Sequence, residues 1–344
     1  MRSPAISIIL PNLNHREFLE ERVASIIQQT YADWECIIVD GFSRDGSFEY
    51  LSNIVQDDKR FKLYQRLAIG PYDAWNYGIE KADGQYIYIA TSDDTMTLDF
   101  LEKMKDALDN NYECDIAHCN LTIINKDSKE LPKNDWSKWE KNIYFGEWLY
   151  KKHIRIAPHD GILHAVFQTV YTSITEIVIR KSLFDKIGLF RTDKGNIADY
   201  EWGMRATLVS NIVHIPEFLA SWRIHDRQLT LNNNFWTRPK HYADLCELIR
   251  IAVMKVNKII YRPFDVYKLQ TIYQEKRFIA EWKETRGKCR KVFLATKWMF
   301  LRPDIFKRFL KFRKKKLQWP HTFTRLHDFL SPYELEKKIK IYDK

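Results

Sequence analysis

Residues 85–95 read QYIYIATSDDT, and this stretch decides how the chain is interpreted. Residues 86–90 favour a β-strand, and they lead almost directly into the adjacent carboxylates of Asp93 and Asp94. Two neighbouring carboxylates repel each other, and burying them costs free energy. A strand that ends in such a pair indicates either a site where something compensates the charge or an exposed turn.

Similar apolar runs occur on both sides of this strand, and helical patterns separate them. The predicted strands are 5–10, 35–40, 61–66, 85–90 and 115–123, and the predicted helices are 16–29, 46–55, 72–81 and 98–110. Continuous apolar strands that alternate with helices predict a mainly parallel sheet covered by helices on both faces. The fold class is therefore α/β, with a Rossmann-like sheet.

Polar side chains also follow the first two predicted strands. Asn12 and Asn14 come after the first strand, and Asp40 ends the second. Ligands of open α/β sheets bind outside the carboxyl ends of the strands, so we expect these residues to share one crevice with Asp93 and Asp94. The chain contains neither the G-x-G-x-x-G dinucleotide motif nor the G-x-x-x-x-G-K-[ST] phosphate loop. We therefore expect a divalent cation that bridges protein carboxylates and a diphosphate to hold the phosphates.

The five cysteines are scattered and form no CxxC pair, which favours a reducing compartment over a disulfide framework or a zinc site. The first apolar run is too short for a signal peptide, and no run is long enough to span a membrane. We therefore expect a cytoplasmic location, with peripheral contact to the inner face of the cell membrane.

Five ordered motifs carry a resemblance to a known family: SIILPNLN, ECIIVDGFSRDGS, GPYDAWNYGIEKADGQYIYIATSDD, ADYEWGMRA and SWRIHDRQLT. Together they resemble the family 2 glycosyltransferases, which have the GT-A fold, over about residues 5–230. The resemblance implies an inverting, metal-dependent enzyme of bacterial cell-surface polysaccharide synthesis. It would move a sugar from a nucleotide-diphosphate sugar, with UDP as the expected nucleotide, to a hydroxyl of a glycan or lipid-linked glycan.

The resemblance also implies a division of the chain. A GT-A domain would span residues 1–235, with a nucleotide-sugar half at about 1–125 and an acceptor half at about 126–235. A basic helical extension would follow at 236–344.

Ten residues receive a role by position in the matching motifs. Pro11, Asn12, Asp40, Asp73, Asn76 and Asp93 would bind the nucleotide sugar, Asp94 and His225 would hold Mn²⁺ or Mg²⁺, and Asp199 would be the general base, with Glu201 as the alternative. The chain departs from the commoner pattern at Gly41 and Ala198, where acidic residues are usual, and Asp45 is a nearby carboxylate that could compensate for Gly41. Residues 199 and 201 point about 200° apart on a helix, so only one of them should reach the acceptor hydroxyl.

Ordinary structural roles compete with these assignments. The carboxylates at 93 and 94 could cap the next helix through an Asx turn, and Asp40 could be a solvated strand end. Asp73 and Asp199 could be acids favoured by a helix dipole, and His225 could be structural. For the whole protein, the alternatives are a sugar-phosphate nucleotidyltransferase and a non-enzymatic binder. The first would want glycine near the first strand, where SIILPNLNHREF has none.

The net charge of +10 is concentrated near the C-terminus. Residues 281–316 contain 14 Lys or Arg and 3 acidic residues, so the rest of the chain is nearly neutral. Phe306, Phe309 and Leu310 recur at helical spacing with lysines on another face, which predicts an amphipathic helix on an anionic membrane surface. A solvated helix and a nucleic-acid-binding surface are the alternatives, although we expect no nucleic-acid partner.

Overall fold

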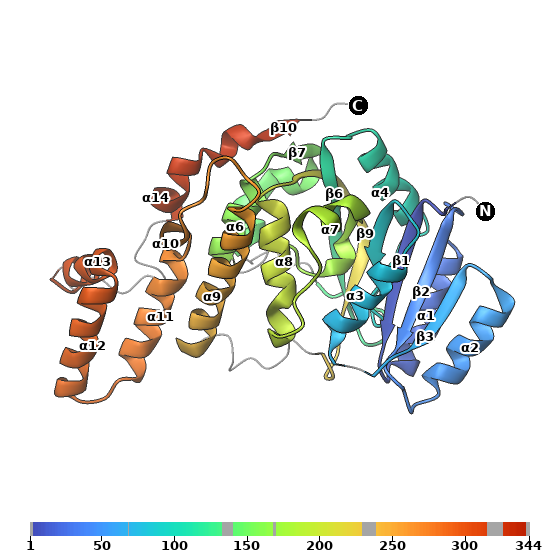
Figure 1. Ribbon diagram of the computed structural model, residues 1–344, viewed down its shortest axis with the longest axis horizontal. Helices are drawn as coiled ribbons and strands as arrows, with labels where there is room; N and C mark the ends of the chain where they lie inside the picture. Colours follow the sequence, from blue (N-terminus) through green and yellow to red (C-terminus); the bar gives the residue numbers. More distant parts are fainter. Residues whose placement is uncertain are drawn as a thin grey trace.

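The computed structural model describes residues 3–67, 69–132, 140–167, 170–228, 239–314 and 326–341 (Figure 1). Parts of three predictions lie outside the described residues. They concern the end of the motif SWRIHDRQLT at 229–230, the domain boundary at 235 and the end of the basic run at 315–316.

The N-terminal half forms the parallel part of the sheet. Its strands are β1 (Ile6–Asn12), β2 (Trp34–Asp40), β3 (Phe61–Gln65) and β4 (Tyr86–Ile89), in the order β4-β1-β2-β3. Its helices are α1 (Arg16–Ile27), α2 (Ser47–Asp57) and α3 (Pro71–Lys81). Side chains of β1 alternate between two hydrophobic clusters, with Ile8 in one and Ile9 in the other, so helices on both faces bury the strands. These elements match the predicted ones within a few residues.

The second half adds strands that run in both directions. They are β5 (Thr95–Met96), β6 (Cys114–Asn125), β7 (His153–Arg155), β8 (Ile177–Arg180) and β9 (Asn211–Ile224). Strand β8 lies antiparallel between β4 and β6, whereas β6 and β9 are parallel, so the sheet is mixed and mostly parallel. The α-helices of this half are α4 (Phe100–Asp109), α5 (Glu140–Phe145), α6 (His159–Phe167), α7 (Lys181–Ile187) and α8 (Ala198–Thr207), with 3₁₀ turns η1 (Gly146–Tyr150), η2 (Ile174–Glu176) and η3 (Gly195–Ile197).

The C-terminal segment is helical over most of its length. It contains α9 (Pro239–Val256), α10 (Val266–Leu269), α11 (Thr271–Glu284), α12 (Lys288–Leu301), α13 (Pro303–Lys314), α14 (Leu326–Leu330), η4 (Ser331–Tyr333) and η5 (Leu335–Lys338). Helices α8, α9, α11 and α12 follow one another away from the sheet, with α12 and α13 at one end of the molecule (Figure 1). Leu245 and Ile249 of α9 share a hydrophobic cluster with Trp202 of α8, so this segment packs on the core of the preceding part.

The prediction that the chain stays helical to its end is wrong at β10 (Ile339–Ile341). This strand pairs antiparallel with β7, where Ile339 lies opposite Arg155, and it extends the edge of the sheet. A three-residue strand carries too little periodicity to be recognised from the sequence, because the neighbouring strand supplies its hydrogen bonds.

Apolar side chains of helix α13 are buried against neighbouring helices of the protein. Ile305 and Phe309 are 0% and 1% exposed, and they pack against Phe278 and Trp298 of α11 and α12. The prediction that Phe309 faces a membrane is therefore wrong, because neighbouring helices cover this side chain. In the described part of the chain, no helix combines the length and apolar character needed to cross a bilayer.

Candidate active site

The carboxyl ends of β1 and β2 bring Asn12 and Asp40 together. The two residues are paired in the parallel register, one position beyond half-buried Pro11. The Asn12 side-chain amide donates to Oδ1 of Asp40 (2.8 Å) and to Oγ of Ser43 (3.0 Å), and the Ser43 backbone N–H donates to Oδ2 of Asp40 (3.0 Å). The Asn12 Oδ1 atom is buried without a hydrogen-bond partner. This oxygen is therefore a buried acceptor whose hydrogen-bonding capacity is unsatisfied.

Asp93 lies against His225, because β5 and β9 hold the acidic loop to the end of β9. The Asp93 Oδ2 atom is 3.1 Å from Nε2 of His225. Arg223 fixes the loop from behind: its Nε donates to the Asp93 carbonyl (2.6 Å), and its guanidinium also pairs with Glu21 (2.6 Å). The tertiary structure thus brings two of the predicted site residues into direct contact.

His15 completes this cluster from the loop that follows β1. Its Nδ1 is 2.6 Å from Oγ of Ser92, and its ring lies edge-on to that of His225. Burial favours the neutral form of Asp93, but the hydrogen bond from His225 and then the charge of His15 outweigh it and lower the Asp93 pKa. Burial also lowers the pKa of His15, although Asp93 opposes this. Asp93 therefore stays ionised among partners that favour its charge.

Asp94 points into the protein and is only 2% exposed. Its Oδ1 accepts the backbone N–H of Arg223 (2.8 Å), and its Oδ2 accepts the hydroxyls of Thr91 (2.5 Å) and Thr175 (3.3 Å). Burial and then the charge of Asp93 raise the pKa of Asp94 to about 7. Because both oxygens accept hydrogen bonds from protein groups, the geometry favours a structural role for Asp94.

Asp199 lies in the first turn of α8 and is exposed to solvent. Desolvation by the surrounding protein raises the pKa of Asp199, and hydrogen bonds from the Tyr72 side chain and the Tyr200 backbone oppose this increase. The Tyr200 N–H lies 2.8 Å from Asp199 Oδ1. A carboxylate that is accessible and has a raised pKa suits a general base.

Glu201, the alternative base, is fully buried in an ion pair with Arg205 on the next turn. The Arg205 Nε and Nη2 atoms lie 3.0 and 2.9 Å from the two carboxylate oxygens. Arg205 also donates to the backbone carbonyls of residues 187–189, so the pair anchors the loop after α7. The structure therefore gives Glu201 a role in stability and leaves it no access to a substrate.

Glu201→Gln is expected to lower the free energy of unfolding by about 3 kcal/mol, because it leaves the buried Arg205 guanidinium without its counter-charge. Urea denaturation followed by circular dichroism measures this loss. The matched control is Glu247→Gln, which breaks the exposed pair with Arg250 and should cost less than about 1 kcal/mol. Equal losses in the two variants would contradict the prediction.

Two residues predicted to contact the nucleoside, Asp73 and Asn76, form hydrogen bonds with other parts of the protein instead. Asp73 accepts two N–H groups from Arg66 (2.8 and 3.1 Å). Asn76 exchanges hydrogen bonds with both backbone groups of Phe190 (2.8 and 3.0 Å), so it ties α3 to the loop after α7. Asp45 accepts backbone N–H groups at the starts of α1 and α2. None of these three joins the Asp93–His225 cluster.

Three residues of the site went unnoticed in the sequence. His15 directly follows PNLN at a strand end, and this position is a signal that could have identified it. Arg223 lies in the motif SWRIHDRQLT, whereas Thr175 carries no such signal, and both reach the acidic loop from far away in the chain, at 129 and 81 residues. Only tertiary contacts bring them there.

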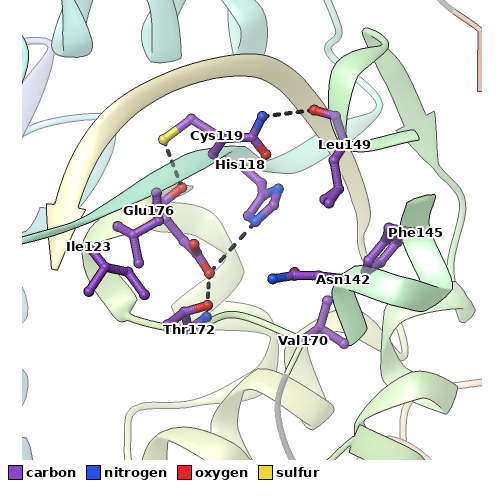
Figure 2. Close-up of a pocket in the computed structure, with 11 residues that line it drawn as sticks. His118, Cys119, Ile123, Asn142, Phe145, Leu149, Val170, Thr172 and Glu176 are labelled. Carbon is purple, nitrogen blue, oxygen red and sulfur yellow. Dashed lines mark hydrogen bonds and ion pairs between the residues drawn. The ribbon is translucent and has the colours of Figure 1, made fainter. Parts of the chain in front are cut away.

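A pocket of about 30 Å³ lies beside this loop, between β6, η1 and residues 170–176 (Figure 2). His118 and Glu176 face each other across it, with Nε2 and Oε1 3.7 Å apart, and Asn120 donates to the Leu149 carbonyl (2.8 Å). Thr175, which contacts Asp94, directly precedes Glu176 in the chain, so the pocket is next to the acidic loop. Its volume suits about two water molecules rather than a sugar ring.

Within the described ranges, no cluster of three or more His, Cys, Asp or Glu side chains is arranged to hold a metal ion. Asp93 and His225 offer one carboxylate and one imidazole. Mg²⁺ usually takes one or two protein carboxylates together with substrate phosphates. The pair therefore fits a cation that binds together with a diphosphate.

Comparison with known proteins gives matches over the N-terminal half. Residues 7–171 match the family model described as "Glycosyl transferase family 2". An uncharacterized glycosyltransferase of Haemophilus influenzae is 40% identical over 132 residues, which are 38% of this chain and 52% of the relative. A putative teichuronic acid biosynthesis glycosyltransferase of Bacillus subtilis, TuaG, is 31% identical over 131 residues, again 38% and 52%. The chain thus spans about half the length of these relatives.

Solved structures match over most of the chain at low identity. TarS of S. aureus, residues 1–349 in complex with UDP, superposes with a TM-score of 0.59 at 13% identity and covers 92% of this chain and 93% of that one. A mannosyltransferase of Pyrobaculum calidifontis, in complex with GDP-Man and Mn²⁺, has a TM-score of 0.52 at 14% identity over 91% of this chain and 85% of that one. These likenesses show the GT-A fold. The family match over residues 7–171 shows that this part of the chain is similar to the family 2 glycosyltransferases.

Proposed function

We propose that the protein transfers a sugar from a UDP-sugar to a hydroxyl of a glycan or lipid-linked glycan in cell-surface polysaccharide synthesis. The observation that carries the proposal is the Asp93–His225 pair at the carboxyl ends of the strands, on the same sheet edge as Asn12 and Asp40. This edge is where open α/β sheets bind their ligands. The similarity of residues 7–171 to the family 2 glycosyltransferases supports sugar transfer over the nucleotidyltransferase and the purely binding alternatives.

The nucleotide would bind at the ends of β1 and β2. Asp40 is buried, and Asn12 has an unpartnered acceptor oxygen beside it. An N–H of a pyrimidine base needs such an acceptor. The UDP and UDP-GlcNAc that bind to TarS are consistent with uracil as the base. Asp73 and Asn76 stay outside this proposal, because their side chains are held by Arg66 and Phe190.

Asp199 would act as the general base. The ionised carboxylate takes the proton of the acceptor hydroxyl while that oxygen forms a bond to the anomeric carbon. The bond from this carbon to the diphosphate oxygen breaks, and its electron pair leaves with the nucleotide diphosphate. Attack from the face opposite the leaving group inverts the anomeric centre.

A divalent cation, Mn²⁺ or Mg²⁺, would neutralise charge on the leaving diphosphate when it is bound. Asp93 and His225 would hold it, since their Oδ2 and Nε2 atoms are 3.1 Å apart and the Asp93 side chain is 18% exposed. The proposal thus moves the cation from Asp94 to Asp93, because the Asp94 oxygens are bonded inside the protein. Arg223 and His15 would position the Asp93 loop.

Thermal unfolding tests the donor class directly. UDP with Mn²⁺ should stabilise the protein by about 2.7 kcal/mol at a nucleotide concentration of 100 times Kd, because it binds only the folded state. GDP under the same conditions serves as the control and should have a much smaller effect. If neither UDP nor any UDP-sugar raised the melting temperature with Mn²⁺ present, the proposed donor class would be wrong.

A further inference from the structure

Helix α12 presents an apolar stripe to solvent. Val292, Phe293, Met299 and Phe300 are 65%, 74%, 42% and 77% exposed. With Cys289 and Thr296, which are also exposed, they recur every three or four residues and cover one continuous side of the helix. We call these six residues the outer stripe.

The opposite side of α12 packs against α11 and α13. Leu294 and Trp298 are 8% and 1% exposed and pack against Phe278 of α11 and Phe309 of α13. The helix is therefore apolar on both sides, although only one side faces a core. Exposed aromatic side chains at regular helical spacing mark an interaction surface rather than isolated exposed residues.

Basic residues border the outer stripe on both sides. By helical position, Arg290 and Lys297 lie along one border and Lys288 along the other, and α12 contains no acidic residue. Lys297 is 3.9 Å from Glu281 of α11, and Lys291 lies over the Trp282 ring. Apolar side chains flanked by lysine and arginine are typical of helices that lie in the surface of an anionic bilayer.

We propose that the outer stripe of α12 lies on an anionic lipid bilayer, with its apolar side chains among the acyl chains and its basic borders at the headgroups. The inference does not depend on the proposed sugar transfer. It replaces α13 as the contact surface, because Phe309 is covered by neighbouring helices. A second copy of this chain is a poorer occupant, since self-association would bring basic borders together.

The wild-type protein offers a reporter for the test. Cys289 lies within the outer stripe and is the exposed cysteine, whereas the other four cysteines of the chain are buried. The full chain carrying an environment-sensitive fluorophore on Cys289 is mixed with vesicles of 70% phosphatidylcholine and 30% phosphatidylglycerol. We expect a blue shift of the emission and quenching by spin-labelled lipids. The control is Cys289→Ser with Tyr112→Cys, which places the same fluorophore at a residue that is 88% exposed elsewhere, and it should show neither effect.

Vesicle co-sedimentation of unlabelled variants separates the contribution of the apolar side chains from that of the basic side chains. Phe293→Ser with Phe300→Ser should weaken binding to anionic vesicles by about ten-fold or more, and so should Arg290→Gln with Lys297→Gln. Neutral vesicles or 0.5 M salt should weaken the wild type similarly. Tyr112→Ser and the exposed pair Lys126→Gln with Lys129→Gln are the matched controls and should bind as the wild type does.

Three outcomes would overturn the inference. They are unchanged vesicle binding in both α12 variants, binding that does not depend on lipid charge, and a dimer in light scattering that the phenylalanine variants dissociate. Because donor-dependent thermal stabilisation is measured without vesicles, failure here is distinguishable from failure of the proposed function.

Discussion

Asp199→Asn is expected to lower kcat about 10³-fold while UDP binding and thermal stability stay close to those of the wild type. The amide cannot accept the proton of the acceptor hydroxyl, and general-base catalysis typically contributes 10²- to 10⁴-fold. Asp199 is exposed, and an asparagine oxygen can still accept the hydrogen bond from Tyr72 of α3, so its replacement should leave the structure intact. Steady-state transfer assays, together with UDP titration calorimetry, measure the two effects.

The control for this prediction is Asp193→Asn, a nearby exposed carboxylate that pairs with Arg191 and should keep normal activity. The pH profile adds an independent readout. Because the pKa of Asp199 is raised and the base must be ionised, kcat/KM should fall on the acid side at a higher pH than for an ordinary aspartate. Tyr72→Phe removes a hydrogen bond that lowers this pKa, so it should move the acid limb to still higher pH. Near-normal transfer by Asp199→Asn would eliminate Asp199 as the base.

Asp93→Asn and Asp94→Asn are expected to behave differently although the residues are adjacent. Asp93→Asn should lower transfer by about 10²-fold or more and remove the dependence of UDP binding on Mn²⁺, because it neutralises the carboxylate beside His225. Asp94→Asn should retain Mn²⁺-dependent UDP binding, since both Asp94 oxygens face protein donors. Its effect should be on stability, at about 1–3 kcal/mol.

Calorimetric titration of UDP with and without Mn²⁺ distinguishes the two variants, and urea denaturation measures their stability. His225→Ala serves as a second test of the cation site and should resemble Asp93→Asn. The reverse pattern would contradict the prediction and identify Asp94 as the cation ligand. In that case, UDP binding would no longer depend on Mn²⁺ in Asp94→Asn but would still depend on it in Asp93→Asn.

Much of the fold could be predicted because it depends on local pattern. Apolar runs such as ISIILPN and WECIIVD alternate with helical patterns, and each strand takes its conformation from its own residues. The parallel order then places the strand ends together, which is why Asn12 and Asp40 could be expected to meet. The sequence alone was less able to identify β10, whose three residues form a strand only beside β7.

The availability of each polar side chain depends instead on tertiary contacts. Asp93 and Asp94 are equivalent in the sequence, but Arg223 and Thr175 reach from distant segments to occupy Asp94, while His225 leaves Asp93 partly accessible. Contacts with other side chains also exclude Glu201 as the general base, because it is paired with Arg205. They exclude Phe309 of α13 as a membrane contact, because α11 and α12 cover it. The α/β order and the sheet edge where a ligand would bind follow from local sequence patterns. Access and charge depend on partners far apart in the chain, so the division of roles among the carboxylates became visible only after folding.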